Sequence, residues 1–163
     1  MTDVHTVATH PLTGCSSRSS MSASTLLQAG KLYHMVELAR WRACQAAQEK
    51  YVPPTYKQDG FIHLTSDPKM LLAVANHFYT AAPGDWVVLV IDPTKLSACV
   101  KFEPAAPVGN KASSGLLAGQ STEQLQDVPL FPHLYGPLEL EAVMAELRMR
   151  RGADGIFLSI EGL

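Results

Sequence analysis

The sequence predicts a single domain of the α+β class, and three observations lead to that prediction. The run WVVLVID, Trp86 to Asp92, is almost continuously apolar and β-branched, which is typical of a central strand covered on both faces. Residues after Met35 instead repeat apolar side chains at helical spacing. The 163 residues, 47% of them hydrophobic and 17% charged, are enough for one domain with a real core.

The composition argues against several classes of protein. No apolar run approaches the roughly 18 to 20 residues of a transmembrane helix, and a formal charge of −2 gives no strong attraction to nucleic acid. The three cysteines are widely spaced and include no C-x-x-C pair, which argues against a disulfide framework or a zinc knuckle. We therefore expect a cytoplasmic protein whose partner is a small-molecule ligand. The sequence carries no signal of oligomeric state.

Two segments fall outside the predicted core. Residues 1–29 are rich in Thr, Ser and Ala and show no apolar periodicity, so they predict a flexible N-terminal leader before a domain spanning residues 30–163. The leader lacks the continuous apolar stretch of a secretory signal. Residues 105–127 contain three glycines and many Ser, Gln and Ala residues, which predicts a mobile insertion.

The domain begins with a predicted strand and a predicted helix. Lys31–Met35 is the strand, and the helix extends over residues 36–51 before Pro53 and Pro54 end it. Its expected apolar face is Leu38, Trp41, Cys44, Ala47 and Tyr51.

A second strand and a second helix follow. Phe61–Leu64 predicts a buried strand on which His63 points away from its two apolar neighbours. Ser66 or Asp67 before Pro68 is a helix start signal, and the helix should continue to about Tyr79. Its expected core face is Leu71, Val74, Ala75 and Phe78.

The second half of the domain predicts two further strands and a helix. In Cys99–Pro104 the side chains alternate, so that Lys101 and Glu103 share one face. The composition of Glu139–Arg150 predicts a short helix with a glycine stop, and Ile156–Ile160 predicts the last strand.

The segment LFPHLYGPL, Leu130 to Leu138, concentrates constrained and chemically able residues. Its two prolines favour extended backbone, and in an extended segment His133 and Tyr135 share one face. Gly136 permits a close approach or a conformation that a side chain would forbid. A purely structural role, in which the histidine and the tyrosine cap a core, explains the same residues.

The motifs LYHM, DGFIHLTS, VVLVID, VKFEP, LFPHLYGPL and DGIFLS, in this order, resemble the domain-of-unknown-function 952 family over nearly all of residues 31–160. That family is similar in fold to the ADP-ribosyltransferase superfamily. The resemblance implies an ADP-ribosyltransferase-like fold, with a bent or split mixed β-sheet, flanking helices and a cleft that binds NAD.

The resemblance also implies roles for four residues. His34 resembles the strand-end histidine that binds the ribose and amide side of NAD, and Thr65 and Ser66 lie where hydroxyl residues line the nicotinamide cleft. Glu103 resembles the glutamate that polarises a ribose hydroxyl, although its place in the chain does not match the usual late strand. The residues themselves add His63, His133 and Tyr135. We expect Glu103 and His133 to be catalytic and the others to bind ligand.

Three functions remain open at this stage. The first is binding of NAD or a related nucleotide, with transfer of ADP-ribose, although no glycine-rich phosphate loop opens a helix. The second is a metal-dependent enzyme with a two-histidine, one-carboxylate site of His63, His133 and Glu103, and His34 as a third imidazole. The third is a non-catalytic ligand-binding or interaction module. No cofactor is implied with certainty, and NAD is the candidate substrate.

Overall fold

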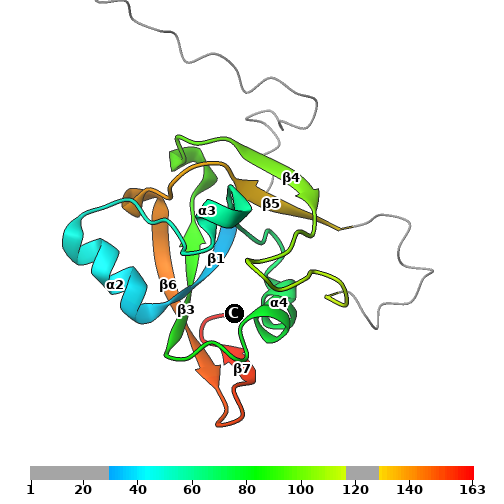
Figure 1. Ribbon diagram of the computed structural model, residues 1–163. Coiled ribbons are helices and arrows are strands. Elements are labelled where there is room, and N and C mark those ends of the chain that lie inside the picture. Colours follow the sequence, from blue (N-terminus) through cyan, green and yellow to red (C-terminus); the bar gives the residue numbers. More distant parts are fainter. Residues whose placement is uncertain (1–29, 117–128) are drawn as a thin grey trace, which may run out of the picture.

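The computed structural model describes residues 30–116 and 129–163, and its strands form two sheets (Figure 1). The first sheet has the order β1-β3-β6-β7 and the second the order β2-β5-β4. All five strand pairings are antiparallel. The expected division of the sheet is therefore present, whereas the expectation of mixed strand direction is wrong. The strands are β1 (Leu32–Glu37), β2 (Ile62–His63), β3 (Trp86–Ile91), β4 (Val100–Pro104), β5 (Leu130–Leu134), β6 (Val143–Arg151) and β7 (Phe157–Ile160).

Short helices connect and cover the sheets. They are α2 (Leu38–Ala47), α3 (Tyr56–Asp59) and α4 (Leu71–Phe78), with 3-10 turns η1 (Pro68–Met70), η2 (Pro93–Lys95) and η4 (Leu140–Ala142). In Figure 1, α2 and α4 lie on opposite sides of the first sheet. A search of the described residues finds no helix with the length and apolar character that crossing a membrane requires.

Strand β3 is the centre of the first sheet, as its sequence predicts. All six of its residues are buried. Val87, Leu89 and Ile91 belong to one core cluster, which includes Trp41 of α2, whereas Val88 and Val90 belong to another, which includes residues of α4. Because successive side chains of a strand point to opposite faces, β3 contributes side chains to both layers of the core.

The start of the second helix is confirmed. The Asp67 side chain accepts a hydrogen bond from the backbone nitrogen of Lys69 at 3.0 Å, and Pro68 occupies the first helical position of η1, which leads into α4. The four residues expected on the core face of α4 are all buried.

The first predicted helix is shorter than expected. Helix α2 ends at Ala47 because Gln48 adopts a left-handed backbone with φ of 54°. Tyr51, which we expected on the apolar face of this helix, lies beyond its end. Its side chain still enters the core, where it is 2% exposed.

The predicted helix over Glu139–Arg150 is wrong. Only Leu140–Ala142 forms a helical turn, and Val143–Arg151 is strand β6, which pairs with β3 on one side and β7 on the other. The residues are good helix formers, but two sets of backbone hydrogen bonds and the burial of Met149 outweigh that local preference.

A short bridge joins the two sheets. The backbone of Tyr33, on β1, exchanges hydrogen bonds of 2.8 Å and 2.9 Å with Thr65, just after β2. The bridge brings β1 next to β2 and β5, and residues of these three strands line one cavity between the sheets.

Residues 105–116, here named the strap, lie across that space. The Gly109 nitrogen donates to the Asp59 carboxylate, and the Gln58 amide nitrogen donates to the Asn110 side chain at 2.9 Å. The expected leader, residues 1–29, and residues 117–128 of the expected insertion lie outside the described residues.

Candidate functional site

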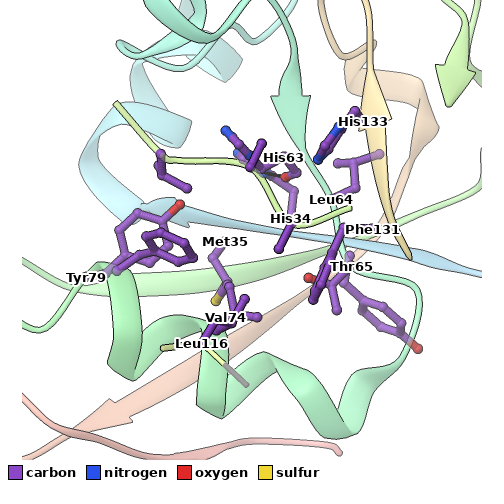
Figure 2. A pocket seen from close by; sticks show the side chains of 15 residues that line it. His34, Met35, His63, Leu64, Thr65, Val74, Tyr79, Leu116, Phe131 and His133 are labelled. Carbon is purple, nitrogen blue, oxygen red and sulfur yellow. Dashed lines mark hydrogen bonds between the residues drawn. The ribbon is translucent and has the colours of Figure 1, made fainter. Parts of the chain in front are cut away.

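The space between the sheets is a cleft of two adjoining chambers. The inner chamber has a cavity volume of about 30 Å³ and the outer chamber about 230 Å³. Figure 2 shows the inner chamber, with side chains converging from β1, β2, α4, β5 and the strap. Both chambers share His34, Met35, His63, Tyr79 and Val108, so they form one continuous site.

His34 is a buried histidine of the cleft, with 5% of its surface exposed. Its Nδ1 lies 2.8 Å from the backbone oxygen of His63, and its Nε2 lies 3.4 Å from the Tyr51 hydroxyl. Because a carbonyl oxygen only accepts, Nδ1 carries the hydrogen and Nε2 accepts from Tyr51. Burial lowers the pKa of His34 from 6.5 to about 4, so this ring is neutral at physiological pH.

His63 is oriented by a carboxylate that the sequence had suggested only as part of a turn. Its Nε2 lies 3.2 Å from Oδ2 of Asp59, whose side chain is 4% exposed. The Asp59 carboxylate also accepts from the Gly109 nitrogen at 3.0 Å. Nε2 of His63 is therefore the donor, and Nδ1 is left without a hydrogen-bond partner among the described residues.

His133 is held in the same manner from the other side. Its Nδ1 lies 2.9 Å from Oε2 of Glu103, which also accepts the Tyr135 hydroxyl at 2.7 Å. The Nζ atom of Lys101 lies 4.4 Å from the centre of the Tyr135 ring. The Nε2 atom of His133 is buried and has no hydrogen-bond partner within the described residues.

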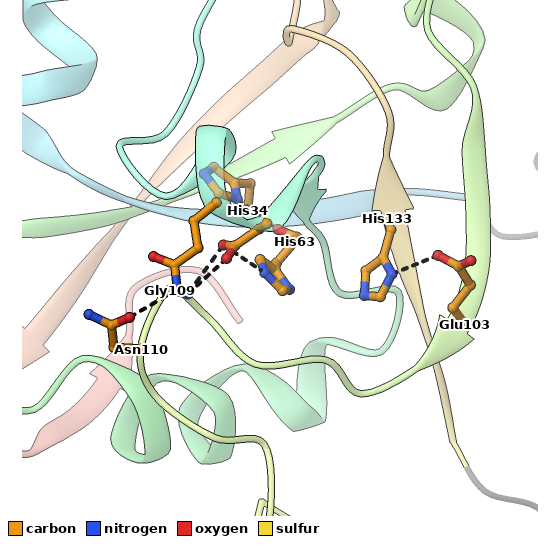
Figure 3. Close-up of polar contacts among 8 residues, drawn as sticks. His34, His63, Glu103, Gly109, Asn110 and His133 are labelled. Carbon is orange, nitrogen blue, oxygen red and sulfur yellow. Dashed lines mark hydrogen bonds and ion pairs between the residues drawn. The ribbon is translucent and has the colours of Figure 1, made fainter.

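The strand register explains why these two histidines meet. His63 and His133 are directly opposed on the antiparallel pair β2 and β5, so their side chains leave the same face. Their ring centres are 5.4 Å apart, and Phe61 stacks on His133 at 4.0 Å. Figure 3 shows the two rings side by side, with Glu103 beyond His133.

The pKa shifts follow from this arrangement. Burial lowers the pKa of both His63 and His133, and the carboxylate beside each ring offsets part of that effect. For Glu103, burial alone would raise the pKa, but hydrogen bonds from Tyr135 and His133 lower it overall. Burial and the bond to Glu103 raise the pKa of Tyr135 to about 12. The site therefore holds ionised Glu103 beside two neutral imidazoles.

The structure brings four of the expected site residues to the inner chamber, namely His34, His63, Thr65 and His133. Glu103 and Tyr135 line neither chamber. Glu103 hydrogen-bonds the His133 ring, and Tyr135 hydrogen-bonds Glu103. Ser66 does not line the inner chamber but a neighbouring depression, which shares Thr65 and Phe131 with that chamber.

The alternative metal site is not formed. Across residues 30–116 and 129–163, no three His, Cys, Asp or Glu side chains gather in a way that could hold a metal ion. Oε2 of Glu103 faces Nδ1 of His133, and the same oxygen accepts the Tyr135 hydroxyl.

Three residues of the cleft were missed by sequence reasoning. Asp59 carried one signal, since it precedes His63 by four residues, but the DG dipeptide reads first as a turn. Arg40 lines the outer chamber and makes no hydrogen bond or ion pair in the part of the chain that the structure describes. Tyr79 lines both chambers, and burial raises its pKa.

The fold and the site define an α+β domain of two antiparallel sheets with a histidine-lined cleft between them. The chain belongs to the family described as protein of unknown function DUF952, which matches residues 35–146. It is similar to CC0527 from Caulobacter crescentus, in the crystal structures of that protein and of a double mutant. Each gives a TM-score of 0.57 at 22% sequence identity, covering 78% of this chain and 93% of that chain. At this identity the similarity concerns the fold. No curated protein matches.

Proposed function

We propose that the chain is a cytoplasmic protein that binds a nucleotide-like small molecule in the cleft between its sheets. One observation carries the proposal: three histidines from three strands, His34, His63 and His133, line a single chamber. Histidines placed for packing alone have no reason to converge on one cavity, whereas a polar ligand needs several fixed donors and acceptors around it.

The walls of the cleft suit such a ligand. Phe131 and Tyr79 provide flat apolar surfaces for a heteroaromatic ring, and the imidazoles provide hydrogen bonds to a sugar. Arg40 supplies a free cation for a phosphate at the outer chamber. The outer chamber, at about 230 Å³, lies slightly below the roughly 300–1,000 Å³ of small-molecule sites.

NAD or a related nucleotide is the candidate ligand, and transfer of ADP-ribose is the candidate reaction. The support is the split β-structure with a cleft at the junction, which the resemblance to the ADP-ribosyltransferase superfamily leads one to expect. In this proposal His133 meets the ribose, and Glu103, which hydrogen-bonds that ring, orients it. His34, His63, Thr65 and Ser66 would contribute to binding, with Tyr135 holding Glu103 in place.

Thermal unfolding in the presence of NAD, ADP-ribose and AMP tests the binding. A ligand at a hundred times its dissociation constant stabilises the folded state by about 2.7 kcal/mol, which is a readily measured shift. His133→Ala should abolish the shift while the protein stays folded. The control is His77→Ala, because His77 lies outside both chambers. An unchanged shift in His133→Ala would remove His133 from the site.

Release of nicotinamide from NAD, followed by chromatography, tests the reaction separately. Release that requires His133 supports ADP-ribose transfer. Stabilisation by NAD without any release would leave a binding protein that does not perform this reaction.

A further inference from the structure

We propose that His63 and His133 form a general acid–base pair that hydrolyses a cyclic phosphodiester of a nucleotide, with Asp59 and Glu103 as their positioning residues. The inference rests on the proposed nucleotide binding and names the bond that is broken.

The first support is the symmetry of the two pairs. Each imidazole gives one ring nitrogen to a carboxylate, Nε2 of His63 to Asp59 and Nδ1 of His133 to Glu103. A carboxylate fixes the tautomer and the ring plane, so that the opposite nitrogen is the one presented to a ligand. Both presented nitrogens, Nδ1 of His63 and Nε2 of His133, lack a partner in the described residues.

The second support is the distance between the rings. Their centres are 5.4 Å apart on directly opposed strand positions, and Phe61 contacts both of them, at 4.7 Å from His63 and 4.0 Å from His133. Two proton-transferring groups at this separation can act on opposite sides of one small reacting centre, such as a phosphorus atom with its attacking and leaving oxygens.

The third support is the composition of the rest of the inner chamber. Apart from the histidines, its lining has hydroxyl groups on Tyr33, Thr65 and Tyr79 but no serine, cysteine or carboxylate. Thr65 is buried, at 4% exposed, and Tyr79 is half-buried. The arrangement therefore favours attack by water, activated by a base, over a covalent intermediate on the protein.

A bound phosphate also affects the protonation of the two rings. Burial lowers the pKa of both His63 and His133, and His133 lowers the pKa of His63 further. The groups facing the pair are Asp59 on α3, Glu103 and Lys101 on β4, His34 on β1 and Tyr135. A bound anion favours one protonated imidazole beside one neutral imidazole, which is the state that acid–base catalysis requires.

The step then balances as follows. Neutral His63, whose side chain is 17% exposed, takes a proton through Nδ1 from a water molecule while the water oxygen bonds to phosphorus. Protonated His133, whose Nε2 is buried, gives its proton to the ribose oxygen as the phosphorus–oxygen bond of the ring breaks. The product is a nucleoside monophosphate, and exchange of one proton with solvent restores the starting pair.

The test uses the full chain with 2′,3′-cyclic AMP, and phosphorus NMR follows the conversion of the cyclic ester to a monoester. We expect turnover, with a loss of at least about 100-fold in His63→Asn and in His133→Asn, the lower end of what general acid–base catalysis contributes. Leu158→Ala, purified in parallel, should keep the rate of the natural chain, because Leu158 is 63% exposed on β7 and lines neither chamber. Circular dichroism and thermal unfolding establish that each variant is folded.

The pH profile supplies a readout that a structural role would not change. A plot of rate against pH should be bell-shaped. Its fall on the alkaline side, the alkaline limb, gives the pKa of the acid, His133. Glu103→Gln removes the anion that favours protonated His133, so this limb should move to lower pH while KM changes little. An alkaline limb that stays in place would overturn the assignment of Glu103 and His133.

The remaining outcomes separate this inference from the proposed binding. If AMP stabilises the protein but the cyclic ester is not hydrolysed, the acid–base pair is refuted and the binding stands. If the two histidine variants retain the activity, the activity is a contaminant and the inference falls. If no nucleotide stabilises the protein and none is hydrolysed, both proposals fall.

Discussion

Nδ1 of His133 lies 2.9 Å from Oε2 of Glu103, and the opposite nitrogen of the same ring is buried without a hydrogen-bond partner among the described residues. A buried lone pair of this kind costs free energy unless a ligand or a water satisfies it. The arrangement therefore sacrifices some stability to present a basic nitrogen in a cleft.

Removal of the Glu103 charge should lower the pKa of His133. Burial lowers that pKa and Glu103 raises it. Without the Glu103 charge, burial therefore lowers the pKa of His133 further. Titration of the His133 ring signals by NMR measures the change. Tyr135→Phe serves as the matched variant, because it removes a hydrogen bond to Glu103 but keeps the carboxylate. A His133 pKa that rises in Glu103→Gln would contradict the assigned tautomer.

The burial of His34 should make folding sensitive to pH. The pKa of His34 is about 4 in the folded chain and 6.5 when the imidazole is freely solvated, so between these values the unfolded chain binds a proton that the folded chain does not. Stability from this residue is full above pH 6.5 and decreases as pH falls toward 4, by about 3 kcal/mol in total. Denaturant unfolding from pH 7 to 4 should show a smaller decrease for His34→Gln than for the natural chain. Equal decreases would show that His34 is not the group responsible.

Asp59 should control the strap locally. Its carboxylate accepts from the Gly109 nitrogen and from His63, so Asp59→Ala removes the attachment of the strap next to the cleft. Hydrogen exchange of the strap amides should become faster while exchange in β3 is unchanged. Asp154→Ala is the matched control, since Asp154 also accepts from a backbone nitrogen but in the turn before β7. Protection of the strap that survives in Asp59→Ala would argue against this role.

Gly136 should tolerate no side chain while Ala98 is present. A Cβ atom at Gly136 would overlap the Cβ atom of Ala98. Gly136→Ala should therefore destabilise the protein by about 1–3 kcal/mol, the usual cost of overpacking. The double variant with Ala98→Gly should recover much of that loss, because the overlapping atom is then absent. Additive losses in the double-mutant cycle would place the strain elsewhere.

The core should depend strongly on Leu89 and little on Leu158. Leu89, on β3, is 0% exposed, and Leu158, on β7, is 63% exposed in the same sheet. Leu89→Ala should lower the free energy of unfolding by about 2–5 kcal/mol, and Leu158→Ala by about 0.5 kcal/mol or less. Denaturant unfolding of both variants measures the difference. A large effect at Leu158 would show that this face is covered by something in solution.

The fold was predictable where the pattern of one segment decides its structure. The apolar run of β3 and the Asp67-Pro68 start of the second helix needed no partner to be recognised. Strand β6 was mistaken for a helix because its residues favour helices. A second signal was present, since Val143, Ala145, Leu147 and Met149 alternate with exposed or polar residues, which is the period of a strand.

The site was predictable only in part, because it depends on pairing between distant segments. His63 and His133 could be selected as able residues, but their direct opposition comes from the register of β2 and β5. The burial of Asp59 depends on the strap crossing above it, which no local pattern shows. Ser66 was selected by its place after Thr65, yet only Thr65 reaches the inner chamber, and Ser66 lines the neighbouring depression that Thr65 also borders.

The bridge between Tyr33 and Thr65 connects the two sheets that form the walls of the cleft. His34 belongs to the first sheet, and His63 and His133 belong to the second, so the gap between them follows any rotation of one sheet against the other. The bridge consists of two backbone hydrogen bonds, of 2.8 Å and 2.9 Å, beside the inner chamber. A ligand that enters between the imidazoles therefore contacts residues of both sheets at once.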